Sequence, residues 1–218
     1  MAAEISKNPL VGRGESPVCG NNLFQAASEI LGGTREEVEG ENMNERVNLI
    51  FLDIDGVLNS HDFNIAAGSC PIERRCVEQL NRVIAATEAK FVLSSAWRYM
   101  LLDTEFGPAA MTIKGFEYLM RTHGTVGFSL LGTTCSDEEC DWNPDDNQPV
   151  RGMQIRRWLR DHGRNHPLKR YVVVDDADLG ITGESLPFVM TDGRVGLTAE
   201  VADQIIASLS GTPAGEGR

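Results

Sequence analysis

One stretch of the chain, residues 48–59, constrains the fold more than any other. It reads Asn-Leu-Ile-Phe-Leu-Asp-Ile-Asp-Gly-Val-Leu-Asn, so an unbroken apolar run leads directly into Asp53 and Asp55 and then a glycine. A short apolar run bounded by polar residues is typical of a strand buried on both faces, as in a parallel sheet. Because open α/β sheets bind ligands at the carboxyl ends of their strands, both aspartates stand where a site would form.

The spacing of Asp53 and Asp55 also predicts a metal ion. In an extended chain their side chains lean the same way, because side chains alternate with a period of two. Two like charges held this close repel each other, and burial raises the cost further. A divalent cation resolves the conflict, and carboxylate oxygens are ligands that suit Mg²⁺. The alternative is an ordinary acidic turn, since Asp-Gly is a common turn pair.

Two later apolar runs end in a similar way. The first, Lys-Phe-Val-Leu-Ser-Ser, places Ser94 and Ser95 at a strand end, where hydroxyls and backbone amides can bind a phosphoryl oxygen. The second, Tyr-Val-Val-Val-Asp-Asp, is rich in β-branched residues and ends in Asp175 and Asp176. Two acidic strand ends with a serine pair between them in the chain favour one shared site.

The order of these motifs resembles that of the haloacid dehalogenase-like (HAD) superfamily of phosphotransferases, over roughly residues 47–209. The continuation Ser-Ser-x-Trp-Arg is similar to the HAD domains found in, or related to, RNA-repair proteins. The resemblance implies a Rossmann-like α/β fold, with a central parallel sheet of about five strands and helices on both faces. The segment 60–69 is too short for a large cap domain, which implies an open site.

The resemblance also implies a role for the residues of the first two motifs. Asp53 is expected to be the nucleophile that takes the phosphoryl group. Asp55 is expected to be the general acid/base, and its backbone carbonyl is expected to join the metal shell. Ser94 is expected to supply the phosphate-binding hydroxyl, with Ser95 as the alternative.

Further roles follow for the remaining motif residues. Asp176 is expected to bind the metal directly, and Asp175 to lie in its shell or bind through water. The cation that steadies the phosphoryl charge is expected to be Arg151, at the start of a helix, or Lys169, just before the strand that ends in Asp175. Arg98 is expected to clamp a phosphate through its planar guanidinium.

Three neighbouring side chains have simpler interpretations. Trp97 is expected to pack in the core rather than stack on a base. His61 is interpreted as a solvent-facing loop histidine rather than a substrate contact. Trp142 lies in an acidic loop that is interpreted as solvated, the alternative being a rim over the pocket. Periodicity and capping residues predict helices over about 71–89, 109–122, 151–159 and 198–209, and further strands over 128–131 and 186–190.

The 218 residues are expected to form one catalytic domain over 46–210. The segment 1–45 is expected to be a flexible or partly helical extension with a helical island at 22–31, and 211–218 a disordered tail. The five cysteines are odd in number and irregularly spaced, and are interpreted as free thiols. The sequence has no apolar run long enough for a bilayer and no signal-peptide pattern, so a cytoplasmic location is expected.

The formal net charge of −12 and the pI of about 4.8 argue against a general binder of nucleic acids or anionic membranes. They are compatible with a phosphorylated ligand held by a metal and a few cations. We therefore predict a Mg²⁺-dependent phosphatase that forms an aspartyl-phosphate and acts on a nucleotide or a nucleic-acid terminal phosphate. The alternatives are a small-metabolite phosphatase and a non-catalytic binding or regulatory protein with the same fold.

Overall fold

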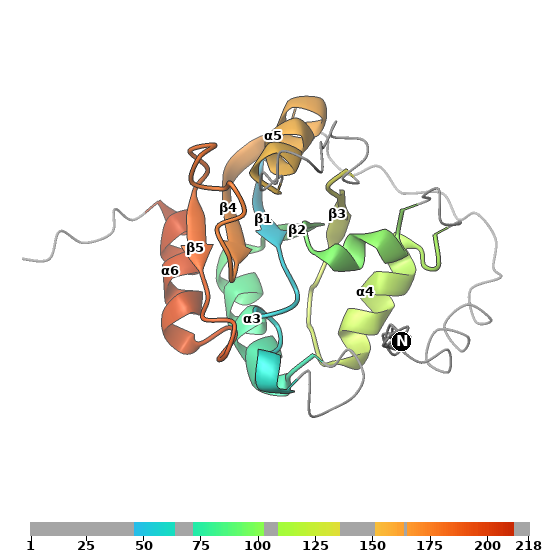
Figure 1. Ribbon diagram of the computed structural model, residues 1–218, viewed down its shortest axis with the longest axis vertical. Helices are drawn as coiled ribbons and strands as arrows, with labels where there is room; N and C mark the ends of the chain where they lie inside the picture. Colours follow the sequence, from blue (N-terminus) through green and yellow to red (C-terminus); the bar gives the residue numbers. More distant parts are fainter. Residues whose placement is uncertain (1–45, 64–71, 103–108, 136–150, 164, 212–218) are drawn as a thin grey trace, which may run out of the picture.

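The computed structural model describes residues 46–63, 72–102, 109–135, 151–163 and 165–211 (Figure 1). Its centre is a five-stranded sheet in the order β3-β2-β1-β4-β5, in which every neighbouring pair is parallel. The strands are β1 Val47–Leu52, β2 Lys90–Leu93, β3 Leu130–Thr133, β4 Leu168–Asp175 and β5 Phe188–Met190. The predicted α/β class, with a parallel sheet of about five strands, is confirmed.

Helices cover both faces of this sheet, which explains why β1 is apolar at every position from Leu49 to Leu52. Ile50 and Leu52 face a core to which three helices contribute, whereas Leu49 and Phe51 face a core with the fourth. Figure 1 shows the fourth of these helices, α5 Arg151–His162, standing apart from the other three. The three helices that pack against Ile50 and Leu52 are α3 Arg74–Thr87, α4 Ile113–Thr122 and α6 Ala199–Ser210.

Two helices begin later than the sequence predicts. Helix α3 starts at Arg74 because Glu73, its N-cap, still has extended backbone angles, so the prediction of a start at position 71 is wrong. Helix α4 starts at Ile113 because the Thr112 side chain accepts a hydrogen bond from the amide of Gly115. A cap of this kind satisfies an amide that the first helical turn leaves unpaired.

Some predictions fall on segments that the structure does not describe. These are the expected extension at 1–45 with its helical island, Trp142, and most of the C-terminal tail. Within the described residues, Cys76 is a free buried thiol, whereas Cys135 is disulfide-bonded. The interpretation of all cysteines as free thiols is therefore wrong at Cys135. Every helix in the described part of the chain is too short or too polar to span a bilayer.

Candidate active site

The predicted motifs meet because their strands are neighbours in the sheet. Strand β1 lies between β2 and β4, and Leu52 is in register with Leu93 and Val174. The ladder continues past the strand ends, since the amide of Asp53 donates to the carbonyl of Val174 at 3.0 Å and the amide of Ser94 to that of Leu52 at 3.0 Å. The polar residues that follow β1, the serine pair that follows β2 and the aspartate pair at the end of β4 therefore lie at the same carboxyl edge.

Three aspartates converge at this edge. Asp53, Asp175 and Asp176 each offer one carboxylate oxygen, and these oxygens lie within 4.8 Å of one another. Oxygens that share one octahedral Mg²⁺ lie at most about 4.2 Å apart, so small side-chain rotations suffice to complete a shell. A set of hard carboxylate oxygens at this spacing fits a divalent cation of this kind.

One cation is built into the cluster. Arg151, the first residue of α5, donates from Nη1 to Oδ1 of Asp53 at 2.9 Å and to Oδ2 of Asp175. Lys169, the alternative, is exposed at the beginning of β4, while Asp175 is at its end. The six residue steps along the strand between them span about 20 Å. The alternative assignment to Lys169 is therefore wrong, and Arg151 is the cation next to the predicted nucleophile.

Burial disfavours the ionised form of two carboxylates in the cluster. Burial raises the pKa of Asp53 from 3.8 to about 7, against the opposing charge of Arg151, and the charge of Asp175 adds to the rise. Burial likewise raises the pKa of Asp175, again opposed by Arg151. A bound divalent cation would favour the ionised form of both carboxylates.

The two adjacent aspartates have different surroundings. Asp175 is fully buried, and both of its oxygens accept hydrogen bonds, Oδ1 from the amide of Ala177 at 3.0 Å and Oδ2 from Arg151. Asp176 is partly exposed, and its Oδ2 lies 3.0 Å from Nε2 of His61. This difference favours Asp176 as the direct metal ligand and Asp175 as the partner of the Arg151 guanidinium.

The side chains of Ser94 and Ser95 have different surroundings at the end of β2. Ser95 is hydrogen-bonded through its side chain to Asp53, and its Oγ also accepts from the amide of Trp97 at 3.3 Å. The buried Oγ of Ser94 finds no hydrogen-bond partner within the described residues. The hydroxyl that contacts the predicted nucleophile is therefore that of Ser95. Ser94 keeps a buried donor for which the protein provides no acceptor in this part of the chain.

Asp55 is held by two side chains to which the sequence analysis gave no such role. The indole Nε1 of Trp97 donates to Oδ2 of Asp55 at 3.0 Å, and Nδ2 of Asn59 donates to Oδ1 at 3.1 Å. Trp97 is 7% exposed and meets Phe116 edge-to-face, so the expectation that it packs in the core is confirmed. The position of Asn59, four residues after Asp55 in a tight loop, was a usable signal for this contact.

Arg98 has a structural position rather than the expected phosphate-facing one. It is 3% exposed, and its guanidinium donates to the carbonyls of Ser95 at 2.9 Å and Cys135 at 3.1 Å. A third hydrogen bond, of 3.1 Å, reaches the hydroxyl of Tyr99. Arg98 therefore joins the loop after β2 to the end of β3, and the expected phosphate clamp is not supported.

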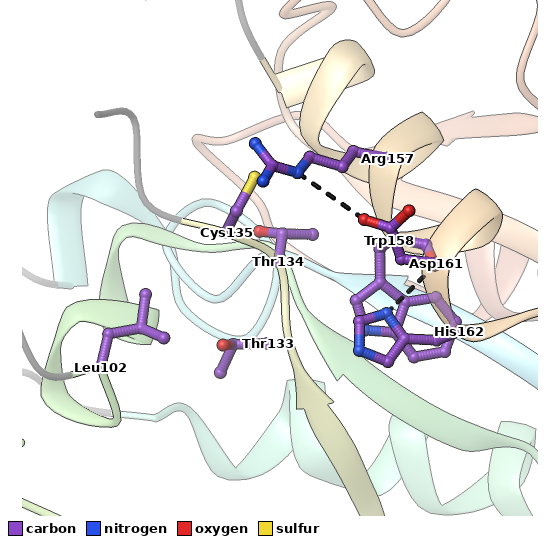
Figure 2. A pocket seen from close by; sticks show the side chains of 8 residues that line it. All are labelled: Leu102, Thr133, Thr134, Cys135, Arg157, Trp158, Asp161 and His162. Atoms are coloured by element: carbon purple, nitrogen blue, oxygen red, sulfur yellow. Dashed lines mark hydrogen bonds and ion pairs between the residues drawn. The ribbon is translucent and has the colours of Figure 1, made fainter. Parts of the chain in front are cut away.

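A cavity of about 250 Å³ lies beside the same edge of the sheet, at the end of β3 (Figure 2). Thr134, which lines the cavity, lies one strand away from Ser94 and Ser95. Its amide donates to the carbonyl of Leu93, the residue before Ser94, at 3.0 Å. Opposite, Trp158 stacks on His162 with ring centroids 4.9 Å apart. The lining residues are Leu102, Thr133, Thr134, Cys135, Arg157, Trp158, Asp161 and His162.

Comparison with known proteins identifies the family. The model of a family described as the HAD domain in Swiss Army Knife RNA repair proteins matches residues 49–202, from β1 into α6. No curated protein and no solved structure matches the chain. HAD membership indicates a hydrolase of the phosphatase type, and the aspartate cluster is compatible with the metal that such domains use. The chain therefore belongs to the family of HAD domains in Swiss Army Knife RNA repair proteins.

Proposed function

We propose that this protein is a Mg²⁺-dependent phosphatase that hydrolyses a phosphate monoester through an aspartyl-phosphate on Asp53. One observation carries the proposal. Asp53, Asp175 and Asp176 converge at the carboxyl ends of β1 and β4, together with Arg151, whose guanidinium contacts two of them. Family membership supports the same class of chemistry.

The oxygens of Asp53 and Asp176, with the backbone carbonyl of Asp55, would hold the Mg²⁺, and Asp175 would lie in its shell. When bound, the cation supplies positive charge that offsets the charge on the phosphoryl oxygens. Its charge would also oppose the effect of burial, which raises the pKa of Asp53. The ionised carboxylate of Asp53 is the form that can attack phosphorus.

In the first step, a carboxylate oxygen of Asp53 attacks phosphorus. The new bond between that oxygen and phosphorus forms as the bond to the leaving oxygen breaks. Asp55 gives its proton to the leaving oxygen, which departs as an alcohol. The guanidinium of Arg151 stabilises the phosphoryl oxygens, and the unpartnered hydroxyl of Ser94 is available to donate to one of them. Ser95 orients Asp53 through their hydrogen bond.

In the second step, Asp55, now ionised, takes a proton from a water molecule that attacks the phosphorus. The bond between phosphorus and Asp53 breaks, inorganic phosphate leaves, and both carboxyl groups return to their starting states. Asp55 serves both steps from one position, where Trp97 and Asn59 each hold one of its oxygens. This arrangement keeps the acid/base close to the nucleophile two residues earlier.

The proposed substrate is a nucleotide or a nucleic-acid end that carries a phosphate. The family is described as a domain of RNA repair proteins. The cavity at the end of β3 is small for a drug-sized ligand but suits a single ring system such as a base. It is two strands from β1, about 10 Å across the sheet, a reach that a nucleoside attached to the phosphate can span. Small sugar phosphates are the second candidate, which the net charge of −12 favours.

The test is a phosphatase assay on the full chain with Mg²⁺ and with a chelator. The substrates are p-nitrophenyl phosphate, mononucleotides, sugar phosphates, and oligonucleotides with a 3′- or 5′-phosphate. Asp53→Asn is the test variant, and Asp203→Asn, an exposed acid on α6, is the matched control. We expect Mg²⁺-dependent release of phosphate that is lost in Asp53→Asn and kept in Asp203→Asn. Absence of turnover across the panel, or an active Asp53→Asn variant, overturns the proposal.

A further inference from the structure

His61 makes a contact that the proposed chemistry does not use. Its Nε2 lies 3.0 Å from Oδ2 of Asp176, although half of its side-chain surface (53%) is exposed. Its own amide donates to the carbonyl of Gly193 at 2.9 Å, which fixes the backbone beside this contact. The interpretation of His61 as a solvent-facing loop residue is therefore incomplete, because the ring is directed at an acid of the cluster.

Two glycines enclose the same carboxylate oxygen. A Cβ atom placed on Gly56 or on Gly193 would lie 2.3 Å from Oδ2 of Asp176, which is far inside contact distance. Gly56 also has a φ of +75°, a backbone conformation that side chains rarely adopt. The glycine at 56 is held in turn by Thr191, whose hydroxyl donates to its carbonyl at 2.8 Å. Oδ2 of Asp176 thus sits in a slot that only glycines leave open.

We propose that His61 is a positioning residue for the metal site. It donates from Nε2 to Oδ2 of Asp176 and so presents the other oxygen, Oδ1, to a divalent cation shared with Asp53. The inference rests on the proposed function, because it assigns the cation to this cluster. It needs only a proton on Nε2, which both the neutral tautomer and the charged ring supply. Donors behind a ligating carboxylate fix its orientation and commonly change metal affinity 10–100-fold.

The short segment that carries His61 supports two acids at once. Asn59 holds Asp55, and His61, two residues later, holds Asp176. Ser60, between them, is anchored to the start of α3, since its amide and its hydroxyl donate to Oε1 of Glu73 at 2.6 and 2.7 Å. A short segment with a buried anchor therefore sets the position of both the general acid/base and the metal ligand.

The experiment compares His61→Ala and His61→Gln with the wild type, and uses His123→Gln, at the end of α4, as the matched control. The amide nitrogen of glutamine can take the place of Nε2 as a donor. Binding of Mg²⁺ to the full chain is measured by calorimetry and by the shift in melting temperature, and turnover is measured against Mg²⁺ concentration. We expect His61→Ala to weaken Mg²⁺ binding about 10–100-fold, with kcat at saturating Mg²⁺ largely retained. His61→Gln should recover part of the affinity, and His123→Gln should bind as the wild type does.

Three results would overturn the inference while leaving the proposed function intact, provided that Asp176→Asn abolishes Mg²⁺ binding. The first is wild-type affinity in His61→Ala. The second is equal loss in His61→Ala and His61→Gln, which would exclude a donor role. The third is a fall in kcat without a change in affinity, which would indicate a substrate contact. If neither Asp53→Asn nor Asp176→Asn alters Mg²⁺ binding, both the inference about His61 and the metal site of the proposed function are wrong.

Discussion

The Nη1 atom of Arg151 donates a hydrogen bond of 2.9 Å to Oδ1 of Asp53, which lies 98 residues earlier in the chain. The same atom donates to Asp175 at the end of β4. One guanidinium therefore compensates two buried carboxylates on adjacent strands. It makes the start of α5 part of the site, although α5 packs on the face of the sheet opposite to α3, α4 and α6.

Replacement of Arg151 by glutamine is expected to lower both stability and turnover. Two buried carboxylates would lose their counter-ion, which typically costs about 3–5 kcal/mol in the metal-free protein. Loss of a donor to the phosphoryl oxygens is expected to lower kcat about 10²–10³-fold. Chemical denaturation without metal and steady-state kinetics with Mg²⁺ measure the two effects.

The matched control for Arg151 is Arg156→Gln, on the same helix. Arg156 pairs with Glu184 at the surface, and half of its side chain is exposed. Exposed pairs contribute about 0–1 kcal/mol, so this variant should keep nearly full stability and activity. Wild-type kcat in Arg151→Gln would contradict the assignment of this cation to the phosphoryl group.

Trp97→Phe is expected to affect the chemical step more than binding. Phenylalanine retains an aromatic ring next to Phe116 but lacks the N–H that donates to Asp55. Loss of one hydrogen bond of about 1–1.5 kcal/mol corresponds to roughly a tenfold fall in kcat. KM and Mg²⁺ affinity should change little. Phe116→Leu disturbs the same aromatic contact without removing the donor, so it should lower stability and leave kcat largely unchanged. A fall in kcat in Phe116→Leu together with an unchanged kcat in Trp97→Phe would refute the role of Trp97.

Gly56→Ala is expected to damage the metal site through backbone strain and steric overlap. Its positive φ disfavours alanine by about 1–2 kcal/mol, and the added methyl would displace the carboxylate of Asp176. Gly183→Ala is the control, because a Cβ there meets only an ordinary contact of 3.5 Å. Calorimetry should show weaker Mg²⁺ binding in Gly56→Ala alone. Equal affinities in the two variants would show that the slot does not position Asp176.

Glu73→Gln is expected to give a pH-dependent loss of stability. Burial alone would raise the pKa of Glu73, but hydrogen bonds from Ser60 and Arg75 hold it below its ordinary value of 4.5. An acid whose pKa is lowered by folding stabilises the fold when ionised. This contribution is fully present above pH 4.5 and is lost as the pH falls through the lowered pKa.

Urea denaturation over a range of pH measures this effect. The variant should be less stable than the wild type by about 1–3 kcal/mol near neutral pH, and the difference should shrink in acid. Glu78→Gln, which removes an exposed pair with Arg74 on the same helix, should have little effect at any pH. A difference that does not depend on pH would mean that the charge of Glu73 has no part in anchoring Ser60.

The sequence predicted the frame of the site because strand ends leave a strong local pattern. Apolar runs that stop at Asp53, Ser94 and Asp175 indicate strands, and the rules of parallel sheets bring their carboxyl ends together. The same rules could have excluded Lys169, since a residue that precedes a strand lies at the opposite edge from one that follows it. The structure confirms the sheet and shows which of the two candidate cations reaches the site.

The contacts that the sequence did not predict are those made by side chains in the segments that follow the strands. Nothing in the local pattern around His61 indicates that it meets Asp176, more than one hundred residues later. Arg98 carries the charge expected of a phosphate ligand, and only the tertiary structure shows that its donors are directed at backbone carbonyls. Likewise, the choice between the two adjacent serines depends on backbone geometry after β2 rather than on residue type.

Chemical trapping of the phosphorylated residue would identify the nucleophile. The full chain is mixed with p-nitrophenyl phosphate and Mg²⁺, stopped with borohydride, and mapped by peptide mass spectrometry, because borohydride reduces an aspartyl-phosphate to homoserine. We expect conversion of Asp53 to homoserine in the presence of substrate, and none when the substrate is omitted. Turnover without conversion at Asp53, or conversion at another aspartate in its place, would show that Asp53 is not the nucleophile.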